Sequence, residues 1–294
     1  NLLLVSLPEY YMLLLASIPA GIGWGSSGPI GGIHAQLVEK HSGKIISPYY
    51  AMGFNIGIFL GGVLAGLILK NDISPSVVFL CLSILSFVVS IIVYLNGLPK
   101  ELDFEGEGEK IKLPEKNVLI FGFLLFVIFG SNGIIIDWSA LWFTKELYAP
   151  LHLASLGLIF LSMGGILANL FSIQLINILS EKIVGCYFVI LGSILLFISI
   201  TQLNFYFILI TFFIYGFLTA NLVPIIIRQA VKQSSESITT TVTNLITMGF
   251  SAMLFAPAII GFVAETLSLT TNMYALSIII FIAGNIFLRQ FREN

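Results

Sequence analysis

The chain has 294 residues, of which 57% are apolar and only 10% are charged, and its formal net charge is −2. Soluble domains are about 45–50% apolar and about 25% charged, so a water-soluble fold of this length would lack the polar groups that must cover its surface. The high hydrophobicity also excludes an intrinsically disordered chain, and without a basic excess nothing points to nucleic acid as a partner. The composition therefore predicts a protein that lies in the lipid bilayer.

Nine apolar runs are long enough to cross a membrane, which takes about 20 residues of α-helix. The runs are residues 10–28, 47–69, 74–95, 117–143, 153–179, 184–203, 205–227, 238–264 and 270–288. Turn-forming or charged segments separate them, such as Lys70-Asn71-Asp72 and Ala149-Pro150. The sequence thus predicts an all-α, polytopic membrane protein.

The longest polar segment follows the third run and is charged, contains glycine and is bounded by prolines. This composition is typical of a linker between two membrane bundles. We therefore expect three parts: residues 1–97 with three spans, residues 98–116 as a cytoplasmic linker, and residues 117–294 as a six-helix bundle.

The cationic residues fall almost entirely on one side of the membrane when the nine spans alternate in direction. Of the 13 Lys and Arg residues, only Lys70 and Lys145 lie on the side opposite the linker. Cytoplasmic loops carry an excess of Lys and Arg, so we expect the C-terminus to be cytoplasmic and residue 1 to be outside. An odd number of spans that starts outside leads us to expect further spans before residue 1.

Several short motifs sharpen this interpretation. They are Ile33-His34-Ala35-Gln36, Asp137-Trp138-Ser139, Leu179-Ser180-Glu181-Lys182, Asn221-Leu222-Val223-Pro224 and the stretch from Pro257 to Glu265. Together with the linker, they resemble the major facilitator superfamily and, within it, the fucose-permease-like, sugar-transporter-like branch. The resemblance implies two six-helix halves around a central cavity, with the nine spans corresponding to the fourth through twelfth and the first three mostly absent.

The candidate substrate-binding residues are the polar ones inside spans, because a polar group in hydrocarbon is costly unless it faces a cavity or a partner. Asp137 is the only acidic residue well within a predicted span. It is interpreted as a substrate acceptor or proton carrier, or alternatively as a partly hydrated residue that fixes an outer loop. Trp138 offers a face for a sugar to stack on, although tryptophan is also common at membrane interfaces.

Three amides complete the predicted substrate site: Asn132, Asn55 and Asn221. The alternative role of Asn132 is to clamp one helix to another, which contributes about 0.6 kcal/mol in a membrane bundle. The remaining intramembrane amides, Asn169, Gln174, Asn244 and Asn285, are expected to be structural.

Charged residues near the cytoplasmic side suggest conformational roles. Glu181 and Lys182 are predicted to form a state-dependent gate of ion pairs with Arg228 or Lys232, the alternative being an ordinary solvated turn. His34 is a candidate proton relay because its side chain titrates near neutral pH, or else an interfacial histidine.

No sequence motif for catalysis is present: there is no His-Glu-x-x-His, Gly-x-Ser-x-Gly or Walker loop, and the two cysteines lie in apolar runs. We expect no metal site and no cofactor. The sequence predicts a secondary transporter of the cell membrane, not an enzyme. It would move a small polar organic solute, with a sugar as the candidate substrate and the proton as the candidate coupling ion for symport. The alternative is a non-transporting remnant or sensor in the membrane.

Overall fold

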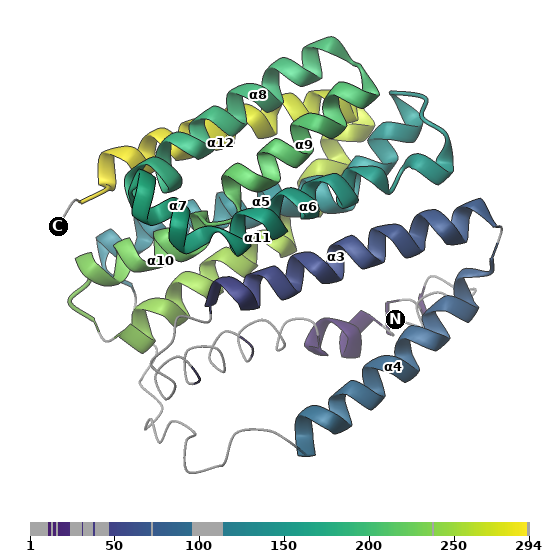
Figure 1. Cartoon of the computed structure of the whole chain (residues 1–294), viewed down its shortest axis with the longest axis horizontal. Helices are drawn as coiled ribbons and strands as arrows, with labels where there is room; N and C mark the ends of the chain where they lie inside the picture. The colour runs from purple at the N-terminus through teal and green to yellow at the C-terminus, as the bar shows by residue number, and fades with distance from the viewer. Residues whose placement is uncertain are drawn as a thin grey trace. The chain divides into compact units, whose positions relative to one another are not determined.

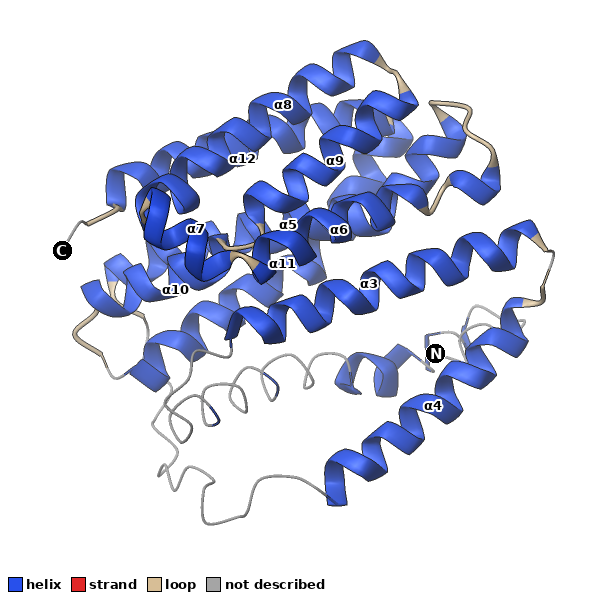
Figure 2. Cartoon of the chain, in the orientation of Figure 1, coloured by secondary structure: helices blue, strands red, loops and turns tan. Residues whose placement is uncertain are grey.

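The structure, a computed structural model, describes residues 11–12, 14–15, 17–23, 31, 38, 47–71, 73–95, 114–236 and 238–292. Every regular element in these residues is helical (Figure 2). Eight helices in this part of the chain are long and apolar enough to cross a membrane. They correspond to eight of the nine predicted runs and confirm the all-α membrane fold, while most of residues 10–28 lies outside the described residues.

Eight helical segments of the described chain account for these spans, and three of them contain more than one helix (Figure 1). Before the charged segment lie α3 (Ser47–Lys70) and α4 (Pro75–Leu95). After it come α5 (Lys116–Lys145), η2 (Leu151–Leu153), α6 (Leu156–Leu170), α7 (Ser172–Leu179), η3 (Ile183–Tyr187), α8 (Phe188–Gln202), α9 (Phe205–Thr219), α10 (Leu222–Gln233), α11 (Ile238–Thr266) and α12 (Leu269–Gln290).

The chain divides into two compact units. One comprises residues 1–44 and 67–111, and the other comprises residues 45–66 and 112–294. The second unit contains the six predicted spans that follow the charged segment, together with most of α3. The three-part division expected from sequence remains a prediction, since most of residues 98–116 lies outside the described residues.

Helix pairs far apart in the sequence build the core of the second unit. α5 packs along α11, α6 packs along α9, and α8 lies against both α9 and α12. Aromatic side chains fill the space between them: Phe143 of α5 lies 5.1 Å from Phe205 and 5.7 Å from Phe212 of α9, measured between ring centroids. These rings lie near one end of the bundle and hold α5 against α9.

Two glycines allow a close contact between α6 and α9 in the second unit. A Cβ atom placed on Gly164 would overlap the carbonyl oxygen of Phe213, and one placed on Gly216 would overlap the carbonyl oxygen of Leu161. Small residues let membrane helices approach this closely, because no side chain separates the two backbones. The two glycines therefore fix α6 and α9 to one another.

The two ends of the bundle differ in charge, as the alternating spans predict. Lys145 ends α5 on one side, next to the loop that meets the start of α12. The other end, where the side chain of Gln233 donates to the carbonyl of Gln290, gathers the remaining described cations of this unit. These are Lys116, Lys182, Arg228, Lys232, Arg289 and Arg292.

Replacing Gly164 or Gly216 with alanine tests the close contact between α6 and α9. We expect each variant to lose about 1–3 kcal/mol of stability, because the new methyl group forces two backbones apart. Gly133→Ala in α5 is the control, since a Cβ there would meet nothing within 4 Å. Thermal unfolding in detergent measures the effect, and equal melting temperatures for all three variants would contradict the contact.

Candidate functional site

Two of the six spans are interrupted partway along their length. The first interruption separates α6 from α7 at Phe171, whose backbone angles are φ −102° and ψ 14°. The second separates α9 from α10 at Ala220 and Asn221, and Asn221 has φ −90° and ψ 0°. Pro224 explains the second break, because its ring clashes with the carbonyl four residues earlier and it lacks an N–H. The first break contains neither proline nor glycine.

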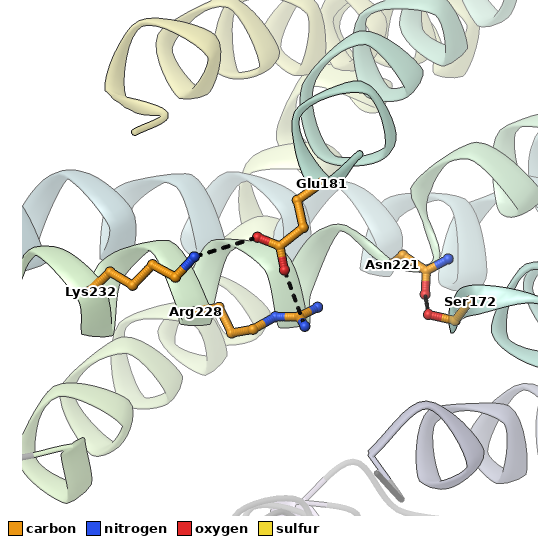
Figure 3. Close-up of polar contacts among 5 residues, drawn as sticks. All are labelled: Ser172, Glu181, Asn221, Arg228 and Lys232. Atoms are coloured by element: carbon orange, nitrogen blue, oxygen red, sulfur yellow. Dashed lines mark hydrogen bonds and ion pairs between the residues drawn. The ribbon is translucent and has the colours of Figure 1, made fainter. Parts of the chain in front are cut away.

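One amide side chain joins these two breaks (Figure 3). The Ser172 hydroxyl donates to Oδ1 of Asn221 over 2.6 Å, and Nδ2 of Asn221 donates to the carbonyl of Ala168 over 3.3 Å. Ala168 lies in the last turn of α6, where carbonyls have no partner within the helix. Asn221 is only 2% exposed. The oxygen and the nitrogen of its amide are thus both hydrogen-bonded within the fold. This favours a role in holding two helices together over the predicted contact with substrate.

An ion-pair cluster joins α10 to the start of the helix that follows α7. Glu181 follows α7, and its carboxylate lies 3.1 Å from Nη1 of Arg228 and 4.0 Å from Nζ of Lys232, both on α10 (Figure 3). The Glu181 side chain is 21% exposed, whereas that of Arg228 is 48% exposed. The structure therefore brings the predicted gate residues Glu181 and Arg228 together, with Lys182 next to Glu181 in the chain. Their role in gating stays a prediction.

Asp137 and Trp138 lie in the outer half of α5 and face different surroundings. Asp137 is exposed and has no hydrogen-bond partner among the described residues. The Trp138 ring packs toward Gly261 of α11, where a Cβ atom would lie 3.6 Å from it. Asn132 is partly buried, and five positions along α5 place it about 140° around the helix from Asp137. The two side chains therefore point to different sides of α5.

Asn55 brings a polar group from α3 to α6. Its amide lies so close to Gly165 that a Cβ placed there would be 2.8 Å from Oδ1 of Asn55, while Nδ2 donates to the carbonyl of Ala51 over 3.2 Å. One turn further along α6, Asn169 is 3% exposed, and its Nδ2 has no partner within the described part of the chain. His34 lies outside the described residues.

The remaining amides from the sequence shortlist have modest roles. Asn285 donates to the carbonyl of Phe281 in its own helix, and Asn244 donates to the carboxylate of Glu236 over 3.4 Å. Gln174 is exposed on α7. None of these contacts joins two spans, in contrast to that of Asn221.

Sequence reasoning missed Glu146, which closes the end of the bundle opposite the ion pairs. Its carboxylate accepts hydrogen bonds from the backbone N–H groups of Leu269 and Thr270, at 2.6 and 2.8 Å, and from the Thr270 hydroxyl. The indole of Trp142 donates to the same hydroxyl over 2.8 Å. A carboxylate at a helix N-terminus is stabilised by the free N–H groups and the helix dipole. In the sequence, Glu146 is only an acidic residue beside a turn. Its partners lie 123 and 124 positions further along the chain, so no local pattern predicts the contact.

The described polar residues of the site are hydrogen-bonding and ionic groups. No group of three or more His, Cys, Asp or Glu side chains that could bind a metal ion occurs in the described residues. The polar side chains instead come from several spans, α3, α5, α6 and α10, within a helical bundle.

Comparison with known proteins defines the family. The profile described as Major Facilitator Superfamily matches residues 1–257. The chain belongs to the major facilitator superfamily. It is therefore a multi-pass membrane protein of a transporter family, embedded in a lipid bilayer.

Two relatives illustrate this membership in the major facilitator superfamily. An uncharacterized MFS-type transporter of Yersinia pestis is 29% identical over 248 residues, which cover 81% of this chain and 62% of the relative. The membrane protein MosC of Rhizobium meliloti is 27% identical over 227 residues, which cover 74% of this chain and 54% of MosC. The chain thus matches less than two thirds of the length of either relative, and the fucose-permease-like branch stays a prediction.

A double-mutant cycle tests the ion pair between Glu181 and Arg228. We expect Glu181→Gln and Arg228→Gln each to lower the stability slightly, and the double variant to lose little more than either single one. The expected coupling is about 0.2–1 kcal/mol, because both side chains are partly exposed and solvent screens the pair. Thermal unfolding in detergent at low salt measures it. Glu265 is an exposed carboxylate with no ion pair among the described residues, so Glu265→Gln should leave the melting temperature unchanged. Additive losses in the cycle would show that the pair contributes nothing.

Proposed function

We propose that this protein is a secondary active transporter that moves a small polar organic solute by alternating access. Membership in the major facilitator superfamily supports transport, and the relative from Yersinia pestis carries the name of an MFS-type transporter. A sugar is the proposed substrate, the cell membrane the proposed location, and the cytoplasm the proposed side of the C-terminus. The gathering of cations at one end of the bundle supports that orientation.

The observation that carries the proposal is the exposed carboxylate of Asp137 inside a membrane span. It lies eight residues before Lys145, which corresponds to a depth of about 12 Å along α5. An ionisable group at this depth is costly, so its place in a membrane protein is a cavity or a transport path. Without a hydrogen-bond partner in the described residues, the Asp137 carboxylate is available to accept a solute hydroxyl or a proton.

The other residues proposed to contact the solute lie apart from that carboxylate, on other faces and helices. Trp138 follows it in α5 and offers an apolar ring face for a sugar. Asn132 and Asn55 are partly buried amides from α5 and α3, and each can exchange hydrogen bonds with a hydroxylated solute. Proton symport is proposed through Asp137, with His34 as the proposed relay. No nucleic acid and no cofactor take part in this scheme.

The ion pair between Glu181 and Arg228 is the proposed gate. Alternating access requires two conformations of similar free energy, and a contact made in only one of them shifts the balance between the two. A partly exposed pair contributes at most about 1 kcal/mol. This is enough to bias the equilibrium and small enough to be broken in every transport cycle.

Uptake by the reconstituted chain tests the role of Asp137. We expect proteoliposomes with an imposed proton gradient to accumulate at least one sugar from a radiolabelled panel. Asp137→Asn should lower the initial rate at least about tenfold, since a hydrogen bond to a charged group contributes about 1.5–3 kcal/mol. Glu265→Gln, which removes a carboxylate at the end of α11, is the matched control and should keep the rate.

Three results distinguish the possibilities. Unchanged uptake by Asp137→Asn would remove this carboxylate from the mechanism. Uptake that persists after the proton gradient is collapsed would exclude proton symport. Folded protein that takes up no member of the panel would favour the alternative, a non-transporting membrane protein.

A further inference from the structure

We propose that a groove between α8 and α12 binds an anionic phospholipid, with the end of one acyl chain in the groove and the head group at Arg289. Two features of the structure point to this occupant. One is an apolar groove halfway along the two spans, and the other is an exposed arginine on the same face of α12 near the end of that helix. The lipid site is separate from the proposed site for a transported solute and does not depend on it.

The groove runs between two helices that pack side by side (Figure 1). Its volume is about 210 Å³, and apolar side chains of both helices form its wall. They are Ile194, Phe197 and Ile198 of α8 and Ile278 and Phe281 of α12. Their exposure ranges from 39% to 48%, so the groove opens to the outside of the bundle.

Two serines also line the groove, but they leave it apolar. The hydroxyl of Ser193 donates to the carbonyl of Ile190, and that of Ser277 donates to the carbonyl of Tyr274, each over 2.7 Å. Both hydroxyl protons are thus used within their own helices. A polar solute would lose its hydrogen bonds with water in this groove and gain few in return. A hydrocarbon chain loses none, so the wall suits an acyl chain.

The depth of the groove matches the reach of an acyl chain. Ile278 precedes Arg289 by eleven residues, which corresponds to about 16 Å along α12. The hydrocarbon core of a bilayer is about 30 Å thick, so its midplane lies about 15 Å from either boundary. An arginine near the end of a span keeps its charged group in the polar region at that boundary. A chain that starts beside Arg289 therefore ends in the groove.

Arg289 lies on the same face of α12 as the groove. Eleven residues of α-helix make three turns and about 20°, so Arg289 follows Ile278 on almost the same line along the helix. Ile282 lies between them and is 52% exposed, which shows that this line faces outward. Arg289 is exposed as well and forms no ion pair with another described residue. Its guanidinium is therefore available to a ligand.

The charge at this end of the groove favours a lipid with a net negative charge. Arg292 follows three residues after Arg289 and is also exposed. The carboxylate of Glu181, at the start of the span that contains α8, is paired with Arg228. The two arginines thus attract an anionic head group from the adjacent leaflet. A guanidinium also binds phosphate through two parallel hydrogen bonds.

Tyr187 supplies a polar group on the α8 side of the same boundary. A Cβ atom placed on Gly284 would lie 2.9 Å from the side chain of Ile190, so Tyr187, three residues before Ile190, lies beside the last turns of α12. Its ring is 49% exposed. The Tyr187 hydroxyl can donate to an oxygen of the head group, as tyrosines at membrane interfaces do.

Photocrosslinking in lipid nanodiscs tests this site. The probe is a phosphatidylglycerol with a diazirine near the end of one acyl chain, and a phosphatidylcholine with the same chain is the comparison. Mass spectrometry of the digested full chain measures labelling of the groove residues. Labelling of Phe207 and Ile210, exposed residues of α9 outside the groove, provides the reference for each probe.

We expect the phosphatidylglycerol probe to label the groove about fivefold more than the phosphatidylcholine probe, the ratio that one arginine near an anionic surface produces. Arg289→Gln should remove most of this preference, and Arg289→Lys should keep part of it, because lysine retains the charge without the bidentate geometry. Lys116→Gln is the matched control. It removes one exposed cation from the same end of the bundle, on α5, and should leave the preference unchanged.

Ile194→Trp tests the groove apart from the charge. Its larger ring occupies the space of the acyl chain, so labelling of Ile278 and Phe281 should fall with the phosphatidylglycerol probe while labelling of α9 stays the same.

Equal labelling of the groove by both probes, or no labelling by either, would overturn the proposal. A preference that survives Arg289→Gln would do the same, since it would show ordinary contact with bulk lipid only. Unchanged labelling in Ile194→Trp would exclude the groove as the place of the acyl chain. None of these measurements involves solute uptake, so their outcome is independent of the proposed transport.

Discussion

The structure depends on one constraint, the need of every backbone N–H and C=O group in hydrocarbon to find a partner within the protein. The interior of a continuous helix such as α5 meets this need by its own hydrogen bonds. Each end or interruption of a helix leaves backbone N–H and C=O groups without a partner in the helix, and side chains supply the partners. Asn221 donates to the carbonyl of Ala168 at one interruption, and the carboxylate of Glu146 accepts from the first N–H groups of α12. Polar contacts between helices are thus found where helices begin, end or break.

Much of the fold follows from the sequence, because long apolar runs have one stable form in a bilayer. The runs after the charged segment predict all six spans, and the distribution of Lys and Arg predicts which loops share an end. Pro224 also marks a break in advance. The interruption at Phe171 could not be predicted, since the residues around it have no feature that prevents a helix. Tertiary contacts, including the hydrogen bonds of Asn221, stabilise it instead.

The polar residues of the spans show a further limit of sequence. Asp137 and Asn221 are both expected to contact substrate, yet one is exposed without a partner in the described residues and the other is buried with both its amide oxygen and its amide nitrogen hydrogen-bonded. Because a polar group is costly in hydrocarbon, each of these side chains is expected to find water, solute or a protein partner. A cavity supplies such a partner, and so does a contact between two helices. Only the contacts distinguish them. The pairing of Glu181 with Arg228 was easier to predict, because opposite charges at the same end of a bundle attract each other over some distance.

The closure of the bundle by Glu146 has a consequence for how the protein is made. Its carboxylate ends the first of the six spans, and the N–H groups that satisfy it belong to the sixth, more than a hundred residues later. On a ribosome the first span reaches the membrane long before the last is synthesised. The Glu146 carboxylate therefore stays without these partners until α12 arrives, so this end of the bundle closes only after the sixth span has been made.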